Sequence, residues 1–291
     1  MPLGDHPSFD RPSATTRLWR YTDLPKLIEL LTSSKIWLAS AEILAQDDPY
    51  EGLPGAIQFP HRMWRSIDEV PKELRSQILE IYGKDSNGTP EAAFRLWMMV
   101  EEQRCIMTLS GRRNYYVNCW HAAEYESVAM WKVYGSPGAG VAVISNGARI
   151  EHSLSSTDES FYLGKVRYVE PSFVRIGGSN AFDDVMIKRS NFEYEREVRL
   201  VYWDTSEGHD ALENFSWNAE KLRFDDLIDD PRPVNPGMAF DCEVDVLIER
   251  IIVSPFAPDW YAPMLDRLRD RLGYRFSVHK SELLAAPPRI D

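Results

Sequence analysis

The C-terminal stretch constrains the fold more than any other part of this sequence. Residues 247–254 form an apolar run, residues 258–272 carry apolar side chains at helical spacing, and residues 274–279 form a second strand-like run. Gly273 directly follows the helical stretch, and glycine commonly ends helices in a left-handed conformation. The order strand, helix, strand predicts a βαβ unit, which is right-handed if its strands are parallel.

Helical patterns gather early in the rest of the chain and strand patterns late. Their interleaving predicts an α+β fold with a mixed or antiparallel central sheet, an N-terminal helical half and the C-terminal βαβ unit. The predicted helices start near Asp23 and cover 70–83, 89–104 and 122–134, and the predicted strands are 18–21, 35–40, 105–109, 115–120, 140–145, 164–169 and 196–203.

No shift in composition divides the chain into two domains. We expect an N-terminal arm over 1–16, a single catalytic-type α+β domain over 17–284 and a tail over 285–291. The three cysteines are widely spaced and the N-terminus lacks a leader pattern, which favours a cytoplasmic protein. No apolar run approaches the roughly 20 residues of a membrane helix, so no membrane partner is expected.

The net charge of the chain indicates which kinds of partner it can bind. The formal net charge is −12 and no run of lysines and arginines occurs. Phosphate backbones need clustered basic side chains, so nucleic acid is disfavoured and a small-molecule or protein partner is favoured. The sequence contains no phosphate-binding loop of the GxxxxGK[ST] type, no HExxH and no GxSxG, and its histidines lack metal-binding spacing. Cys119 and His121 can share a strand face, where buried packing is the favoured interpretation.

Residues 194–202 carry the most informative pattern. In an extended strand, Glu195, Glu197 and Arg199 share one face and the apolar residues between them enter the core. The two carboxylates would stand about 6–7 Å apart, and their repulsion in a partly buried setting would raise the pKa of at least one. Such pairs occur at functional sites, although a solvated face of an edge strand gives the same pattern.

Eight blocks in order along the chain carry a resemblance to a known family. They are 18–22, 47–51, 118–121, 126–131, 140–143, 165–168, 188–199 and 252–255. Over nearly its whole length the chain resembles the large bacterial and phage family filed as domain of unknown function 2971. Asp47 stands where that family more often has asparagine, which leaves the part of Asp47 in any site open.

An arginine in the first strand and a later Glu-x-Glu are also similar to the layout of ADP-ribosyltransferases of the Arg–Ser–Glu type. This resemblance implies that NAD is the substrate, that Arg20 grips its phosphates and ribose, and that Glu197 stabilises the ribosyl oxocarbenium. It implies further that Glu195 faces the acceptor, for example a protein, and that no metal takes part. Tyr21, Ser40, Ser145 and Arg199 are the other candidate NAD contacts, whereas Trp131 fits core packing better.

Two other functions stay open. In a metal-dependent phosphodiesterase or nuclease, Asp48 and Glu51 would join the two glutamates around Mg²⁺, with Lys188 or Arg199 on the phosphate. In a non-catalytic ligand- or partner-binding module, for example in phage defence, the glutamates would hold a structural arginine network. NAD dependence and metal dependence distinguish the enzymes from each other.

Overall fold

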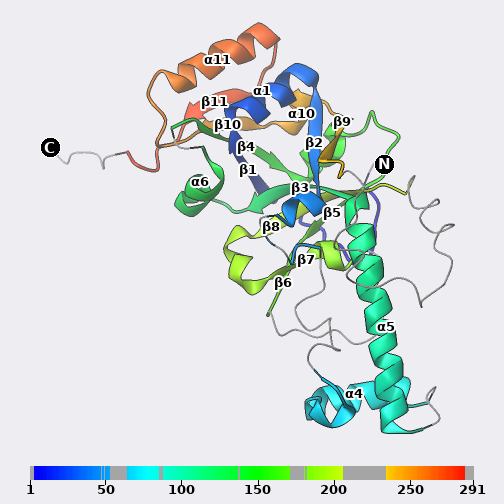
Figure 1. Cartoon of the computed structure of the whole chain (residues 1–291). Helices are drawn as coiled ribbons and strands as arrows, with labels where there is room; N and C mark the ends of the chain where they lie inside the picture. The colour runs from blue at the N-terminus through cyan, green and yellow to red at the C-terminus, as the bar shows by residue number, and fades with distance from the viewer. Residues whose placement is uncertain are drawn as a thin grey trace.

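The computed structural model centres on one large mixed sheet (Figure 1). It describes residues 3–46, 48, 50–52, 64–84, 88–136, 138–170, 180, 182–205 and 234–285, and for 102–110 only the backbone. The strands are β1 (Arg17–Asp23), β2 (Lys35–Ser40), β3 (Tyr115–Ala122), β4 (Gly140–Asn146), β5 (Phe161–Lys165), β6 (Arg167–Val169), β7 (Ile187–Arg189), β8 (Glu197–Trp203), β9 (Gly237–Asp241), β10 (Arg250–Val253) and β11 (Ser277–Lys280).

Helices α1, α2, α4 and α5 precede the bulk of the sheet, in agreement with the expected N-terminal helical half. Asp23 caps the first of them by accepting a hydrogen bond from the backbone of Lys26, and Pro25 lies in its first turn. The α-helices are α1 (Leu24–Ser33), α2 (Ala41–Leu44), α4 (Lys72–Tyr82), α5 (Pro90–Gly111), α6 (Val128–Tyr134), α7 (Gly147–Ser153), α10 (Val244–Leu247) and α11 (Tyr261–Leu272), and the 3₁₀ turns are η2 (Ile67–Glu69), η3 (Arg112–Asn114), η4 (Asp184–Met186) and η5 (Ser190–Glu195).

The strand order confirms the α+β class. It runs β11-β10-β4-β1-β3-β2-β9, with β8 on β3 and β5 on β8, while β6 and β7 form a small separate pair. Strands β10 and β11 are parallel and joined by α11, which confirms the βαβ unit, and Gly273 ends α11 with a φ of 81°. The other described pairings of the large sheet are antiparallel.

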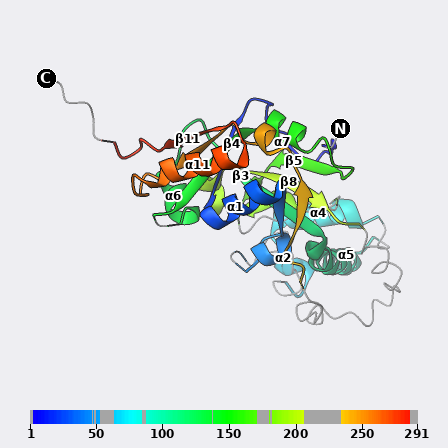
Figure 2. The ribbon, with the colours of Figure 1, turned by 90° about the horizontal axis from the view of Figure 1, so that it is seen from above.

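Helices pack on both faces of the sheet. The main core face holds Leu18, Trp120 and Val198 and is covered by α1, α10 and α11, of which α1 and α11 lie next to each other (Figure 2). The opposite face, here called the α6 face, holds Trp19 and Tyr21 against α6. Side chains alternate along each strand, so neighbouring residues of β1, β3 and β8 face opposite sides.

Two strands, β1 and β2, pair with the same edge of β3, but at opposite ends of it. Residues 115–121 of β3 all pair with β8 on the other edge. On the first edge, β1 pairs with β3 only at His121 and Ala122, and β2 pairs with it only at Tyr116 and Val117. Within the described chain, residues 118–120 therefore have no strand partner on that edge. We call this gap between β1 and β2 the fork.

Helices α4 and α5 form a separate apolar cluster outside the sheet. Figure 1 shows α5 extending away from the strands with α4 at its far end, and Ile78, Phe94 and Trp97 are buried between them. The predicted strand at 105–109 is wrong, because α5 continues to Gly111. Among the described residues, no helix has the length and apolar character needed to cross a membrane.

The N-terminal arm packs on β5. Leu3 forms a bridge with Phe161 and Asp10 with Lys165, so the arm is held along its described length. Phe9 lies against Gly164, where a Cβ would come within 2.9 Å of the Phe9 backbone. Glycine at this position thus permits the close approach.

Replacing Phe9 by alanine is expected to lower the free energy of unfolding by about 3 kcal/mol. The ring is buried, stacks on Tyr162 at 5.1 Å between centroids and meets Phe182 edge-on at 5.2 Å. Urea unfolding measures the loss. Asp5→Ala, whose side chain is exposed, is the control and should change stability by less than about 0.5 kcal/mol; equal effects would mean that the arm does not contribute to the fold.

Candidate active site

The two glutamates singled out by the sequence come from different elements. Strand β8 begins at Glu197, whereas Glu195 is the last residue of η5. Between them Arg196 has a left-handed backbone, with φ 41° and ψ 51°. The expectation that Glu195 extends the strand and shares its face with Glu197 is therefore wrong, because the chain turns at Arg196. Glu197 and Arg199 do share a strand face, as expected.

Arg199 holds Glu197 with two hydrogen bonds. Its Nε donates to Oε1 at 2.7 Å and its Nη2 to Oε2 at 3.1 Å. Its Nη1 donates to Glu51 Oε1 at 2.5 Å and to the Val185 carbonyl at 2.6 Å. Forked arginine–carboxylate pairing of this kind fixes orientation as well as charge. The proposed NAD contact Arg199 is thus engaged within the protein.

Lys188 on β7 forms hydrogen bonds with both glutamates. Its Nζ donates to Glu195 Oε2 at 2.6 Å and to Glu197 Oε2 at 3.3 Å, and lies 3.9 Å from Glu51 Oε2. We call Glu51, Lys188, Glu195, Glu197 and Arg199 the ion cluster. It combines three carboxylates with two cations, so it carries one excess negative charge when every group is ionised.

The ion cluster is buried. Arg199 is 0% exposed, Glu195 4% and Glu197 5%. Strand β8 lies between β3 and β5, so it is not an edge strand. The alternative of a solvated charged face on an edge strand is therefore wrong. A buried charge network costs desolvation free energy, so its presence calls for a role in structure or function.

The pKa of Glu197 moves in the direction opposite to the one expected from repulsion. Burial alone would raise it, but Arg199 and Lys188 outweigh burial and lower the pKa to about 2. For Lys188, burial alone would lower the pKa, but Glu197 and Glu51 outweigh it and raise the pKa. The pair is therefore held ionised, with Glu197 as a permanent anion at neutral pH.

Stability is expected to fall as the pH drops from 4.5, the ordinary pKa of a glutamate, to about 2. The unfolded state takes up the proton first, so the stabilisation is complete above the unfolded pKa and is lost as the pH passes the folded pKa. The two values correspond to about 3 kcal/mol. Urea unfolding at several pH values should show this slope in the wild type and a shallower one in Glu197→Gln; parallel profiles would assign the slope to other groups.

Two tyrosines complete the surroundings of the glutamates. The hydroxyl of Tyr134 on α6 donates to Glu195 Oε1 at 2.5 Å, and the backbone N–H of Glu197 donates to the Tyr168 hydroxyl at 2.8 Å. Burial first, and the nearby carboxylates, raise the pKa of both phenols. Sequence reasoning missed both, because a single tyrosine 61 or 29 residues away carries no spacing signal.

Cys119 and His121 lie beside the glutamates without forming a couple. His121 Nδ1 is 2.5 Å from the carbonyl of Glu195, so we assign the proton to Nδ1 as the donor. Burial and the neighbouring Glu197 raise the pKa of the Cys119 thiol well above its usual value. Such a thiol is a poor nucleophile. Both residues fit the packing interpretation.

Aromatic side chains line the α6 face next to His121. The Tyr21 ring lies 6.1 Å from the His121 ring and 4.9 Å from that of Trp131, edge-on in both cases. Trp131 is 1% exposed and donates its indole N–H to Glu126, so it packs in the core as expected. Tyr21, one of the candidate NAD contacts, therefore lies on the same face of the sheet as Glu197.

Arg20 approaches from the other face and reaches the fork. It alternates with Trp19 and Tyr21 and therefore starts on the main core face, away from Glu197. Its Nη1 donates to the backbone carbonyl of Cys119 at 3.3 Å. Cys119 thus lies between the Arg20 guanidinium and the Glu197 carboxylate, although no described contact joins Arg20 to either glutamate of the pair.

The two candidate serines have structural hydrogen bonds. Ser40 accepts from the backbone N–H of Glu42 and caps α2. Ser145 donates to the carbonyl of Leu247 at 2.6 Å. Both are 0% exposed and lie on the main core face, so the structure does not bring them to the ion cluster.

The acidic residues of the metal hypothesis already have cationic partners. Asp48 accepts from Arg189 at 2.6 Å, and Glu51 is paired with Arg199. No group of three or more potential metal ligands suited to an ion occurs among the described residues. Asp47, whose role was left open, lies outside the described residues. A metal would have to displace an arginine or lysine from each carboxylate.

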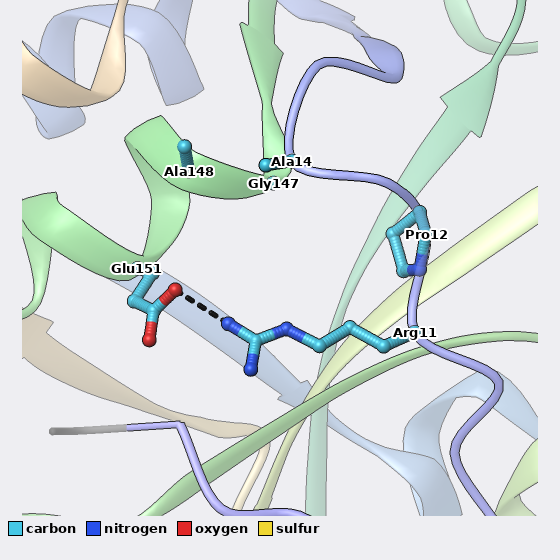
Figure 3. Close-up of a pocket in the computed structure, with 6 residues that line it drawn as sticks. All are labelled: Arg11, Pro12, Ala14, Gly147, Ala148 and Glu151. Carbon is cyan, nitrogen blue, oxygen red and sulfur yellow. Dashed lines mark hydrogen bonds and ion pairs between the residues drawn. The ribbon is translucent and has the colours of Figure 1, made fainter.

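A pocket of about 360 Å³ lies between the N-terminal arm and α7 (Figure 3). Arg11 spans it and forms an ion pair with Glu151 at 2.5 Å. None of its lining residues belongs to the ion cluster or to the fork. We therefore locate the candidate active site at the ion cluster, and not at this pocket.

Comparison with known proteins leaves the family open. No family model matches the chain, and no curated protein matches it. Among solved structures, the chain is similar to Thermus sp. 2.9 DarT in complex with ADP-ribosylated ssDNA, with 12% identity over 94% of this chain and 97% of that one. The TM-score is 0.33, which is too low to carry an argument about fold or function. Membership of the domain 2971 family stays a prediction.

Proposed function

We propose that the protein is an NAD-consuming enzyme of the ADP-ribosyltransferase type, with a nucleotide substrate and either a protein or water as the acceptor. The observation that supports this most is the buried carboxylate of Glu197, which Arg199 and Lys188 hold with hydrogen bonds. A carboxylate held ionised in a water-poor setting is suited to stabilise a ribosyl group that becomes positively charged in the transition state.

In the proposed reaction, Glu197 and Glu195 act on one side of Cys119 and Arg20 acts on the other. The bond between the nicotinamide nitrogen and ribose C1′ breaks, and nicotinamide leaves with the electron pair. Glu197 stabilises the resulting oxocarbenium character at C1′, and an acceptor oxygen then bonds to C1′. Glu195 accepts the proton of the acceptor, while Arg20, on the other side of Cys119, grips the phosphates. The longer Lys188 contact to Glu197, at 3.3 Å, is the one that a ribose hydroxyl would replace.

One observation favours a second candidate, the non-catalytic binding module. Both oxygens of Glu197 already accept hydrogen bonds inside the protein, and the side chain is almost fully buried. In that case the ion cluster is a structural network that holds β7, β8 and the Glu51 segment together. The metal-dependent enzyme is not favoured, because arginines and a lysine occupy the carboxylates it requires.

Nicotinamide release separates the candidates. Purified protein is incubated with NAD, once with EDTA and once with added Mg²⁺, and free nicotinamide is measured by chromatography. The transferase proposal expects release that EDTA does not reduce, together with a rise in melting temperature on adding NAD. Absence of both release and the melting shift contradicts it and favours the binding module, whereas release only with Mg²⁺ would favour the metal enzyme.

A further inference from the structure

The fork contains a half-buried guanidinium, that of Arg20, without a carboxylate partner. In the described part of the chain, the hydrogen bond of Arg20 goes to the Cys119 carbonyl and no acidic side chain lies within ion-pair distance of it. Burial lowers the pKa of this guanidinium. A half-buried arginine that faces no carboxylate is a binding element for an anion, because it presents up to five N–H donors in a fixed planar arrangement.

Two further polar atoms on the same strand lack partners. Trp120 is 2% exposed and Asn118 is 1% exposed. The indole N–H of Trp120 and the Oδ1 of Asn118 form no hydrogen bond. The amide is oriented by its other end, since Asn118 Nδ2 donates to the Trp37 carbonyl at 2.7 Å. Buried groups of this kind are costly unless a ligand or ordered water satisfies them.

The register of the sheet places these groups side by side. Trp19 is paired with His121, so Arg20 is next to Trp120 across the start of the fork. Asn118 lies two residues further along β3 on the same face as Trp120. The free edge of β3 runs between Arg20 and the Trp37 carbonyl that Asn118 contacts.

We infer that the fork binds the pyrophosphate-bearing half of a nucleotide, with Arg20 and the Trp120 indole N–H as donors to phosphate oxygens and Asn118 Oδ1 as acceptor of a ribose hydroxyl. A nucleotide offers phosphate oxygens to the two N–H donors and a ribose hydroxyl to the amide oxygen, so its chemistry matches these three groups. The inference rests on the proposed function, and it adds Asn118 and Trp120 to the site. Ordered water in the fork is the competing explanation of the unpartnered atoms.

Trp120→Phe tests the inference with little disturbance of the fold, because it removes the N–H and retains an aromatic ring. Trp97→Phe is the matched control: Trp97 is also buried with an unpartnered indole N–H, but it belongs to the α4–α5 cluster. Binding of ADP-ribose and of ADP is measured by titration calorimetry for both variants, for Arg20→Gln and for the wild type. Inorganic pyrophosphate and adenosine are then added as competitors.

We expect Trp120→Phe to weaken ADP-ribose binding about tenfold, Arg20→Gln to weaken it about a hundredfold, and Trp97→Phe to leave it unchanged. Pyrophosphate should compete and adenosine should compete weakly. Equal affinity of Trp120→Phe and wild type would overturn the inference and leave water as the partner of the indole, even if the wild type releases nicotinamide. ADP-ribose binding that depends on Trp120 in a protein that does not cleave NAD would instead retain the fork site and remove the proposed reaction.

Discussion

Replacing Arg199 by methionine is expected to lower the free energy of unfolding by about 4 kcal/mol. The substitution removes the cation that holds Glu197 and Glu51, and it leaves two buried carboxylates without their main partner. Lys188 alone remains, and it must then balance three negative charges. The apolar methionine fills much of the same space, so the loss reports the charge and not a cavity. Urea unfolding at pH 7 measures it.

Two further variants decide whether the loss comes from the ion cluster. Arg17→Met removes a half-exposed arginine whose carboxylate partner, Glu124, is 4.0 Å away, and should cost less than about 1 kcal/mol. Combining Arg199→Met with Glu197→Gln removes one unpaired charge and should recover part of the stability. If Arg199→Met is no more harmful than Arg17→Met, the cluster does not stabilise the fold.

Local patterns were sufficient to predict much of the fold. The βαβ unit followed from an apolar run, a helical spacing and the terminal Gly273, all of which act over a few residues. The same reasoning failed at 105–109, where a short apolar run fits a strand or a helix equally well. The structure decides for the helix, since α5 continues without interruption from Pro90 to Gly111.

The fork was beyond prediction from the sequence. It arises because β1 and β2 both pair with one edge of β3, at different ends of that strand. Such pairing depends on long-range contacts, which leave no periodic signal in the chain. The unpartnered atoms of Asn118 and Trp120 likewise become visible only when their neighbours are known.

The candidate site was predicted in composition but not in geometry. Glu197 and Arg199 share a face because strand alternation is local. Glu195 was misplaced, since nothing in the sequence marks Arg196 as left-handed; arginine adopts that conformation seldom. The contacts to Glu51 and Tyr134 span 148 and 61 residues and depend on the tertiary fold.

If the protein cleaves NAD, Glu197→Gln is expected to reduce nicotinamide release about a hundredfold or more. The amide keeps the shape of the side chain but removes the negative charge beside the ribose. It also places an NH₂ group against Arg199 or Lys188, both of which are donors, so some stability is lost as well. Release is therefore measured well below the melting temperature of each protein, at saturating and at limiting NAD.

The control is Glu193→Gln, an exposed glutamate in η5 that makes the same chemical change outside the ion cluster. It should retain both wild-type release and the wild-type melting temperature. A fall in turnover at saturating NAD in Glu197→Gln, with NAD affinity preserved, identifies a group that acts on the transition state. Wild-type turnover in a folded Glu197→Gln variant would contradict the catalytic role of Glu197. The ion pairs of Glu197 with Arg199 and Lys188 would then serve only to join β7 and β8.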